Sequence, residues 1–127
     1  MLSKTNRIKD KKLFPLILKK GTKYYCPFFI FINATNIPNT RNSSVEITKE
    51  NIKVVPRFGF ITSKKVGAAV QRNTVRRVFS EIVRLEISKL KPDSIGIFIA
   101  HKNAVEAPYE SLQAEIKKVF KNSGISI

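Results

Sequence analysis

Residues 66–81, VGAAVQRNTVRRVFSE, combine arginines and an asparagine with enough apolar residues to form a core helix. The two features are compatible only if they lie on opposite sides of one helix. At about 100° per residue, the polar residues of 72–86 share one arc. They are Arg72, Asn73, Arg76, Arg77, Ser80 and Arg84. The opposite arc holds Val75, Val78, Phe79, Ile82 and Leu85. Two residues are exceptions: the apolar Val83 lies just inside the polar arc, and the charged Glu86 lies just inside the apolar arc. The sequence predicts a helix with a core face and an arginine face.

The arginine face favours contact with RNA or DNA. A solvated helix face usually mixes charges of both signs and often pairs Glu with Lys four residues later. Arginine instead binds phosphates bidentately, and asparagine can hydrogen-bond a base edge or a ribose hydroxyl. Just upstream, Lys64 and Lys65 end a predicted strand, and Gly67 permits close backbone approach where the helix begins. The N-terminus of that helix also favours a phosphate.

The overall charge supports the same partner. The 127 residues carry 24 Lys and Arg against nine Asp and Glu, a net charge of +15, and 43% of them are hydrophobic. We expect one globular domain over residues 1–127 with a polyanionic partner. Nucleic acid is the leading candidate; an anionic membrane surface and a merely cationic solubility surface are the alternatives.

No apolar run approaches the roughly 20 residues of a membrane span, and no secretory signal is visible. The single cysteine, Cys26, cannot form an internal disulfide and is expected to pack as a small hydrophobe. A cytoplasmic location and no membrane partner are therefore expected.

The chain reads as α+β, with one sheet backed by helices. We expect helices over 12–20, 67–90 and 108–121, the first closed by Gly21 and the second ended by Pro92. Strands are expected over 24–36, 54–65 and 94–101, the last buried on both faces. Pro56 suggests that the second of these strands begins at a sheet edge. Residues 37–53 read as a long loop with a little strand around 45–48.

The segment SKKVGAAVQRNTVRR (63–77) resembles the protein subunit of bacterial ribonuclease P. The signature is a strand ending in Lys-Lys, then Gly, Ala, Arg-Asn and a basic pair along the next helix. The likeness extends over nearly the whole chain, through NRIKDKKLFPLILKKGTKYY, FFIFIN, RFGFITSKK and IGIFIAHKNA.

The resemblance implies a two-layer sandwich in α-β-β-β-α-β-α order, of the ribosomal protein S5 domain 2-like type. It also implies a left-handed strand–helix–strand crossover, although right-handed crossovers hold in about 98% of cases.

The resemblance further implies two RNA-binding surfaces. The surface for the catalytic RNA comprises Lys64, Lys65, Arg72, Asn73, Arg76, Arg77 and Arg84. A cleft between the first helix and the sheet holds the single-stranded 5′ leader of precursor tRNA and comprises Phe14, Leu18, Phe29, Phe31 and Ile32. Stacking on aromatic side chains in a basic groove suits unpaired RNA. The implied partners are ribonuclease P RNA and precursor tRNA, with no further protein required.

Some positions depart from the family pattern. Thr74 and Ser80 stand where the family commonly has basic residues, and Arg84 lies one turn beyond Ser80. Leu18 replaces a second cleft phenylalanine, and Ile32 stands where the facing strand usually carries an aromatic residue. Phe29 or Phe31 could then supply the stacking.

The sequence predicts no catalytic residue and no metal site in the chain. His101 has no acidic neighbour to orient it, no carboxylate pair suits a two-metal nuclease, and no His/Cys cluster has zinc spacing. We expect His101 to be a surface or RNA-contacting residue. Cleavage would belong to the RNA subunit with Mg²⁺, so that the holoenzyme is an endoribonuclease. A ribosomal or assembly RNA-binding protein without enzyme activity is the alternative.

Overall fold

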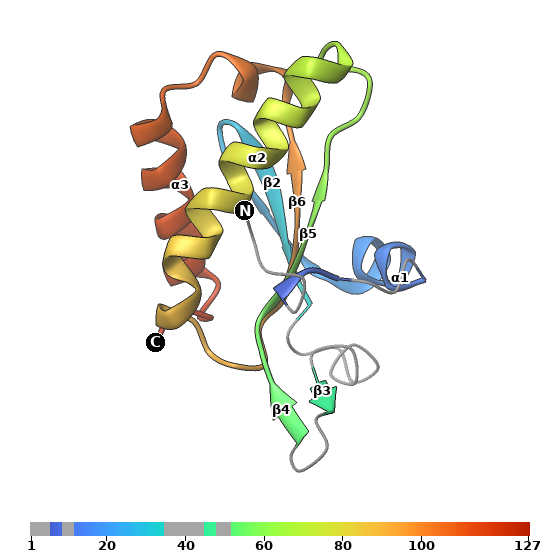
Figure 1. Ribbon diagram of the computed structural model, residues 1–127, viewed down its shortest axis with the longest axis vertical. Helices are drawn as coiled ribbons and strands as arrows, with labels where there is room; N and C mark the ends of the chain where they lie inside the picture. Colours follow the sequence, from blue (N-terminus) through green and yellow to red (C-terminus); the bar gives the residue numbers. More distant parts are fainter. Residues whose placement is uncertain (1–5, 9–11, 35–44, 48–51) are drawn as a thin grey trace.

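The computed structural model describes residues 6–8, 12–34, 45–47 and 52–127. Figure 1 shows the arrangement of its helices and strands. The helices are α1 (Leu13–Lys20), α2 (Ala69–Glu86) and α3 (Tyr109–Asn122), with short 3₁₀ turns η3 (Ile87–Lys89) and η4 (Lys102–Val105). The strands are β1 (Thr22–Tyr25), β2 (Phe29–Asn33), β3 (Val45–Ile47), β4 (Ile52–Val54), β5 (Arg57–Ile61) and β6 (Ile95–Ala100). The predicted α+β class is confirmed.

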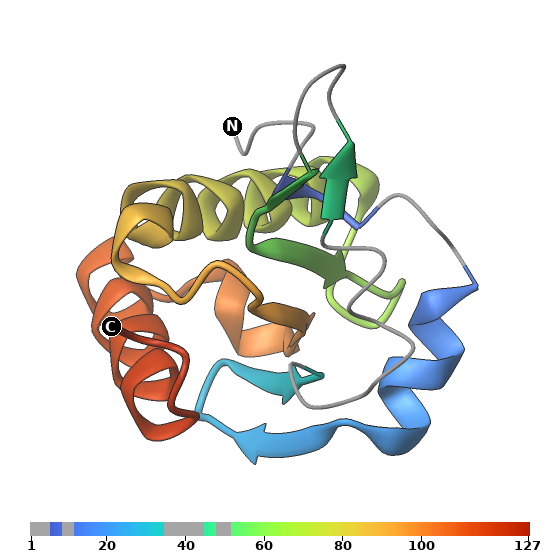
Figure 2. The same cartoon turned by 90° about the horizontal axis from the view of Figure 1, so that it is seen from below.

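The main sheet has the strand order β1-β2-β6-β5. Strands β1, β2 and β6 pair antiparallel, whereas β5 and β6 pair in parallel and are connected through α2. The chain runs up β5, back down α2 and up β6, and the two views in Figures 1 and 2 give this crossover the left-handed sense that the resemblance implies. Strand β5 lies at the sheet edge, as Pro56 predicted.

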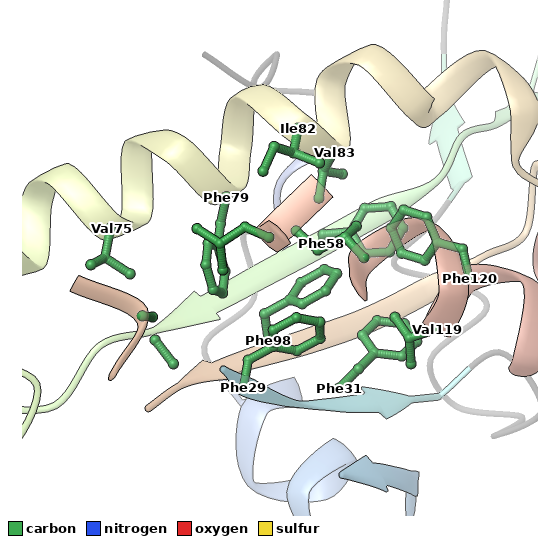
Figure 3. Packing of buried hydrophobic residues seen from close by; sticks show 14 of the residues in the cluster. Phe29, Phe31, Phe58, Val75, Phe79, Ile82, Val83, Phe98, Val119 and Phe120 are labelled. Carbon is green, nitrogen blue, oxygen red and sulfur yellow. The ribbon is translucent and has the colours of Figure 1, made fainter. Parts of the chain in front are cut away.

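Helices cover both faces of the sheet, with α2 and α3 on one side and α1 on the other (Figure 2). Because side chains alternate along a strand, each strand contributes to both cores. The α2–α3 side is built from phenylalanines, including Phe31, Phe58 and Phe98, which pack with α2 and α3 in Figure 3. The α1 side is aliphatic and buries Ile32 and Ile97 against Ile17.

The structure differs from the predicted elements in the aromatic stretch 24–36. This stretch is divided between β1 and β2, which form a hairpin around Pro27. The Cys26 N–H donates to Phe29 O at 2.9 Å and closes the turn. Proline has no N–H for the ladder and fits the turn better than the interior of a strand.

The loop predicted over 37–53 also contains regular structure. Strands β3 and β4 form a two-stranded antiparallel sheet separate from the main one, with Val45 opposite Val54. The expected short strand at 45–48 is therefore found as β3, while residues 35–44 and 48–51 lie outside the described residues.

The long helix ends earlier than Pro92. Helix α2 ends at Glu86, and the chain then tightens into η3, where the Leu90 N–H donates to Ile87 O at 3.1 Å. Leu90 then forms an isolated bridge with Ser126 near the C-terminus of the sequence. This tertiary pairing, which no local signal predicts, stops the helix before the proline.

The buried face of α2 is turned relative to the predicted wheel. Val75, Phe79 and Ile82 are buried as predicted, but Leu85 is 47% exposed and Ser80 is buried. Val83 and Glu86, which lie near the boundary between the polar and apolar arcs of the helical wheel, are also buried. The buried arc is thus centred roughly 60° nearer to Arg72 than predicted. The physical reason is that α2 packs beside α3 as well as on the sheet, and Glu86 Oε1 lies 3.6 Å from Lys117 Nζ of α3.

None of the helices in the described part of the chain is long and apolar enough to cross a membrane.

Candidate nucleic-acid interface

Four neighbouring side chains of α2 form what we call the arginine surface: Arg72, Asn73, Arg76 and Arg77. Asn73, Arg76 and Arg77 are exposed, whereas Arg72 is half-buried because the core face is turned toward it. Among the described residues, none of these three arginines forms an ion pair. Their charges are therefore available to phosphates.

Arg76 is anchored across the gap between α2 and β5. Its Nη2 donates to Thr62 Oγ1 at 3.2 Å, and Thr62 directly follows the last residue of β5. This contact places the guanidinium at the border between the helix and the edge of the sheet. Sequence reasoning missed Thr62, because the contact depends on how α2 crosses the strand.

Arg84 differs from the arginine surface, although the sequence grouped it there. It is exposed, but its Nε donates to Glu81 Oε2 at 3.0 Å and its Nη2 donates to Glu81 Oε1 at 2.5 Å. The hydrogen bond from Arg84 is the main cause that lowers the pKa of the Glu81 carboxyl to about 2. Arg84 is therefore neutralised near neutral pH within its own helix.

Thr74 and Ser80 of α2, which stand where the family commonly has basic residues, use their hydroxyl groups within the helix. The Thr74 hydroxyl donates to Val70 O at 3.0 Å, and the Ser80 hydroxyl donates to Arg76 O at 2.8 Å. Both side chains bond back to the helix backbone. Ser80 is also buried and cannot reach a partner RNA.

Lys64 and Lys65 are exposed, but they lie in a turn and not in the strand, which ends at Ile61. Gly67 follows with φ +155°, and a Cβ at this position would collide with Gln71 Oε1. That oxygen accepts a hydrogen bond from the Ala68 N–H at 2.9 Å. The positive φ, together with this contact inside the chain, favours glycine at the start of α2.

On the opposite side of the sheet, Phe14 and Leu18 of α1 are half-buried. A Cβ at Gly59 would lie 2.7 Å from Cε1 and Cζ of Phe14, so the phenyl ring sits directly over the glycine. The absence of a side chain at Gly59 therefore fixes where the aromatic ring of α1 lies on the sheet.

Two of the predicted cleft residues lie on the other side of the sheet, and a third is buried under α1. Phe29 and Phe31 are fully buried on the α2–α3 side, where Figure 3 shows them packed with Phe98. Strand alternation turns them away from α1, so their assignment to a cleft beside that helix is wrong. Ile32 faces α1 as predicted, but it is fully buried beneath that helix.

A half-buried apolar row lies on the α1 side in their place. Ile30 of β2 is opposite Ile99 of β6, which is opposite Ile61 of β5, and all three are half-buried. We call these three residues the apolar row. Sequence patterns alone could not find it, because its members come from three strands whose order and register are set by tertiary pairing.

The described residues contain no cluster of three or more His, Cys, Asp or Glu that could hold a metal ion. His101 is half-buried beside η4, and its backbone N–H donates to Phe28 O at 2.9 Å. Burial raises the pKa of the Cys26 thiol, which keeps it protonated and unreactive near neutral pH.

Comparisons with known proteins identify relatives of this chain. The Ribonuclease P family model matches residues 2–124. The ribonuclease P protein component of Fusobacterium nucleatum is 33% identical over 125 residues, covering 94% of this chain and 98% of that protein. That of Finegoldia magna is 27% identical over 122 residues, covering 96% and 94%.

Solved structures share the fold. The RNase P protein from Staphylococcus aureus superposes with a TM-score of 0.68 at 25% identity, covering 99% of this chain and 95% of that one. The RNase P protein from Thermotoga maritima gives a TM-score of 0.70 at 19% identity, covering 91% and 96%. With the family match spanning nearly the whole sequence, the chain belongs to the Ribonuclease P family.

Proposed function

We propose that this chain is the protein subunit of a ribonuclease P holoenzyme, in which it binds the catalytic RNA and the 5′ leader of precursor tRNA. The observation that carries the proposal is the arginine surface of α2. Its arginines form no ion pair with described residues. The chain as a whole carries a net charge of +15, which also favours a polyanionic partner. Unpaired guanidinium groups that neutralise phosphates release counterions and so stabilise a protein–RNA complex.

The two sides of the sheet suit two different RNA elements. Arg76 and Arg77, with Lys64 and Lys65 nearby in sequence, suit the phosphates of a folded RNA. The apolar row and Phe14 suit unpaired bases, which stack on aromatic and apolar surfaces with little sequence preference. We assign the first surface to the catalytic RNA and the second to the leader.

Cleavage itself is assigned to the RNA subunit with Mg²⁺, and the holoenzyme acts as an endoribonuclease that produces the mature 5′ end of tRNA. The described residues hold no carboxylate or histidine cluster that fits Mg²⁺, so the protein's part is to bind, to orient and to reduce repulsion between the RNA backbones. A cytoplasmic location belongs to the same proposal, since the single cysteine suits a reducing compartment.

Reconstitution tests the proposal. The protein is mixed with a ribonuclease P RNA, and cleavage of precursor tRNA is measured over a range of Mg²⁺ concentrations. We expect the protein to lower the Mg²⁺ concentration needed, and the double variant Arg72→Ala/Arg76→Ala to lose most of this effect. Lys121→Ala, which removes an exposed cation from α3, is the matched control. A protein that leaves the Mg²⁺ requirement unchanged would instead be an RNA-binding protein without this enzyme.

A further inference from the structure

Strand β1 presents two exposed side chains on the same face of the sheet as α1. The Tyr24 ring contacts the Phe31 ring on the α2–α3 side, with centroids 6.4 Å apart. Because side chains alternate along a strand, Lys23 and Tyr25 point to the opposite face. Both are exposed, and Tyr25 is 75% exposed, which is unusual for so large an aromatic side chain.

Tyr25 continues the apolar row to the edge of the sheet. In the strand register it lies opposite Ile30, which begins the row toward Ile99 and Ile61. Four side chains, one from each strand, thus cross the whole sheet over roughly 14 Å, or three strand spacings. One end of this line lies at Ile61, next to the Thr62–Arg76 contact, and the other end is the tyrosine.

Cations lie near the tyrosine end of this line. Lys23 is two residues away on the same face of β1, opposite Ile32 in the register. On its other side, Tyr25 borders a hollow of 280 Å³ whose lining includes Lys118, Asn122 and Glu115 of α3. An exposed aromatic ring with a lysine beside it on an edge strand is suited to one nucleotide, whose base stacks while its phosphate meets the cation.

We propose that Tyr25 and Lys23 form a distal site for an unpaired nucleotide of the leader, beyond the nucleotides held along the apolar row. This inference rests on the proposed function, because it extends the leader path across β1. A single exposed tyrosine is in general no sign of a site. Here the continuity of Tyr25 with the apolar row and the adjacent Lys23 favour RNA as the partner. A protein strand pairing with the edge of the sheet is disfavoured, because β1 offers it only four residues.

The test uses the holoenzyme and a series of precursor tRNAs with leaders of increasing length, together with mature tRNA. Tyr25→Ala should weaken binding only for leaders long enough to reach β1, by roughly 5- to 150-fold, the value of one base–aromatic stack. Tyr25→Phe should bind like the wild type, since the ring is retained. Lys23→Ala should reduce the salt dependence of long-leader binding by about one counterion. Tyr109→Ala removes an exposed tyrosine at the start of α3 and is the matched control.

A second measurement does not depend on the folding of a Tyr25 variant. The fluorescent base 2-aminopurine, placed at successive leader positions, should be quenched in the wild-type complex at a position beyond those affected by Phe14→Ala. Equal losses for mature tRNA and all leader lengths, or no loss at any length, overturn the inference. If leader length strengthens binding to the wild type but Tyr25→Ala behaves like wild type, only the distal site is wrong. If leader length has no effect on the wild type, the leader-binding part of the proposed function is wrong.

Discussion

Arg76 Nη2 donates to Thr62 Oγ1 at 3.2 Å, and this contact joins the helix that carries the arginine surface to the strand that ends the apolar row. Thr62 is the neighbour of Ile61, the last member of that row on β5. The two surfaces proposed for RNA therefore approach each other at the β5 edge of the sheet. A phosphate of the catalytic RNA that binds Arg76 would lie close to the path proposed for the leader.

Replacing Arg76 with alanine should weaken binding to ribonuclease P RNA. Removing one phosphate-binding cation reduces the slope of log affinity against log salt by about one counterion. The free energy of unfolding should change by only about 0.5 kcal/mol, because the side chain is exposed. Filter binding at several salt concentrations and thermal melting measure the two effects. A large loss of stability with an unchanged salt slope would assign Arg76 a structural role.

Replacing Phe14 with alanine should weaken binding of precursor tRNA and leave binding of mature tRNA nearly unchanged. The loss of one stack costs about 1–3 kcal/mol. Leu16→Ala, at another half-buried position of α1, is the matched control. If the effect comes from poorer packing of α1 on the sheet, the two variants should lose leader binding equally, and Phe14→Ala should also lower the melting temperature.

Replacing Glu81 with glutamine should strengthen binding to the catalytic RNA. The change removes the charge that neutralises Arg84 and frees a fourth arginine on α2 for phosphate contact. The salt slope should rise by up to about one counterion. Arg84→Ala should have little effect in the wild-type background and should cancel the gain in the Glu81→Gln background. An unchanged affinity in the Glu81→Gln variant contradicts this assignment.

The Glu81 carboxyl should titrate far below its usual range. Its pKa is lowered to about 2 by the hydrogen bond from Arg84, so the folded state binds this proton less readily than the unfolded state. The pair therefore stabilises the fold above the ordinary glutamate pKa, and this contribution is lost as the pH falls toward about 2. Carbon-13 NMR of the carboxyl group follows the titration, and Arg84→Ala should raise the pKa toward the ordinary glutamate range.

The turned face of α2 gives a test of packing. Ile82→Ala should destabilise the fold by about 2–5 kcal/mol, since its side chain is fully buried against the sheet. Leu85→Ala should cost about 0.5 kcal/mol, although the helical wheel places both residues in the core arc. Chemical denaturation of the two variants measures the difference. Equal costs would show that Leu85 is covered in solution.

The sequence by itself predicted the fold class, most of the helices and strands, and the exposed arginine face of α2. A 3.6-residue period places arginine and apolar residues on opposite sides of 72–86, and the nearly continuous apolar run IGIFIA predicts a strand buried on both faces. Both patterns are local, so each can be recognised from neighbouring residues. The motif in 63–77 then led to the family without any knowledge of how the elements pack.

Only the tertiary structure decided which residues share the α1 side of the sheet. Phe29 and Ile30 are adjacent in sequence, yet one is core beneath α2 and the other is a half-buried member of the apolar row. Which of the two alternating faces meets α1, and which strands bring Ile30, Ile99 and Ile61 into line, depends on strand order and register. Strand order and register are fixed by long-range pairing and by the helices packed on each face, because a slip of one residue would exchange the two faces of the strand that slips.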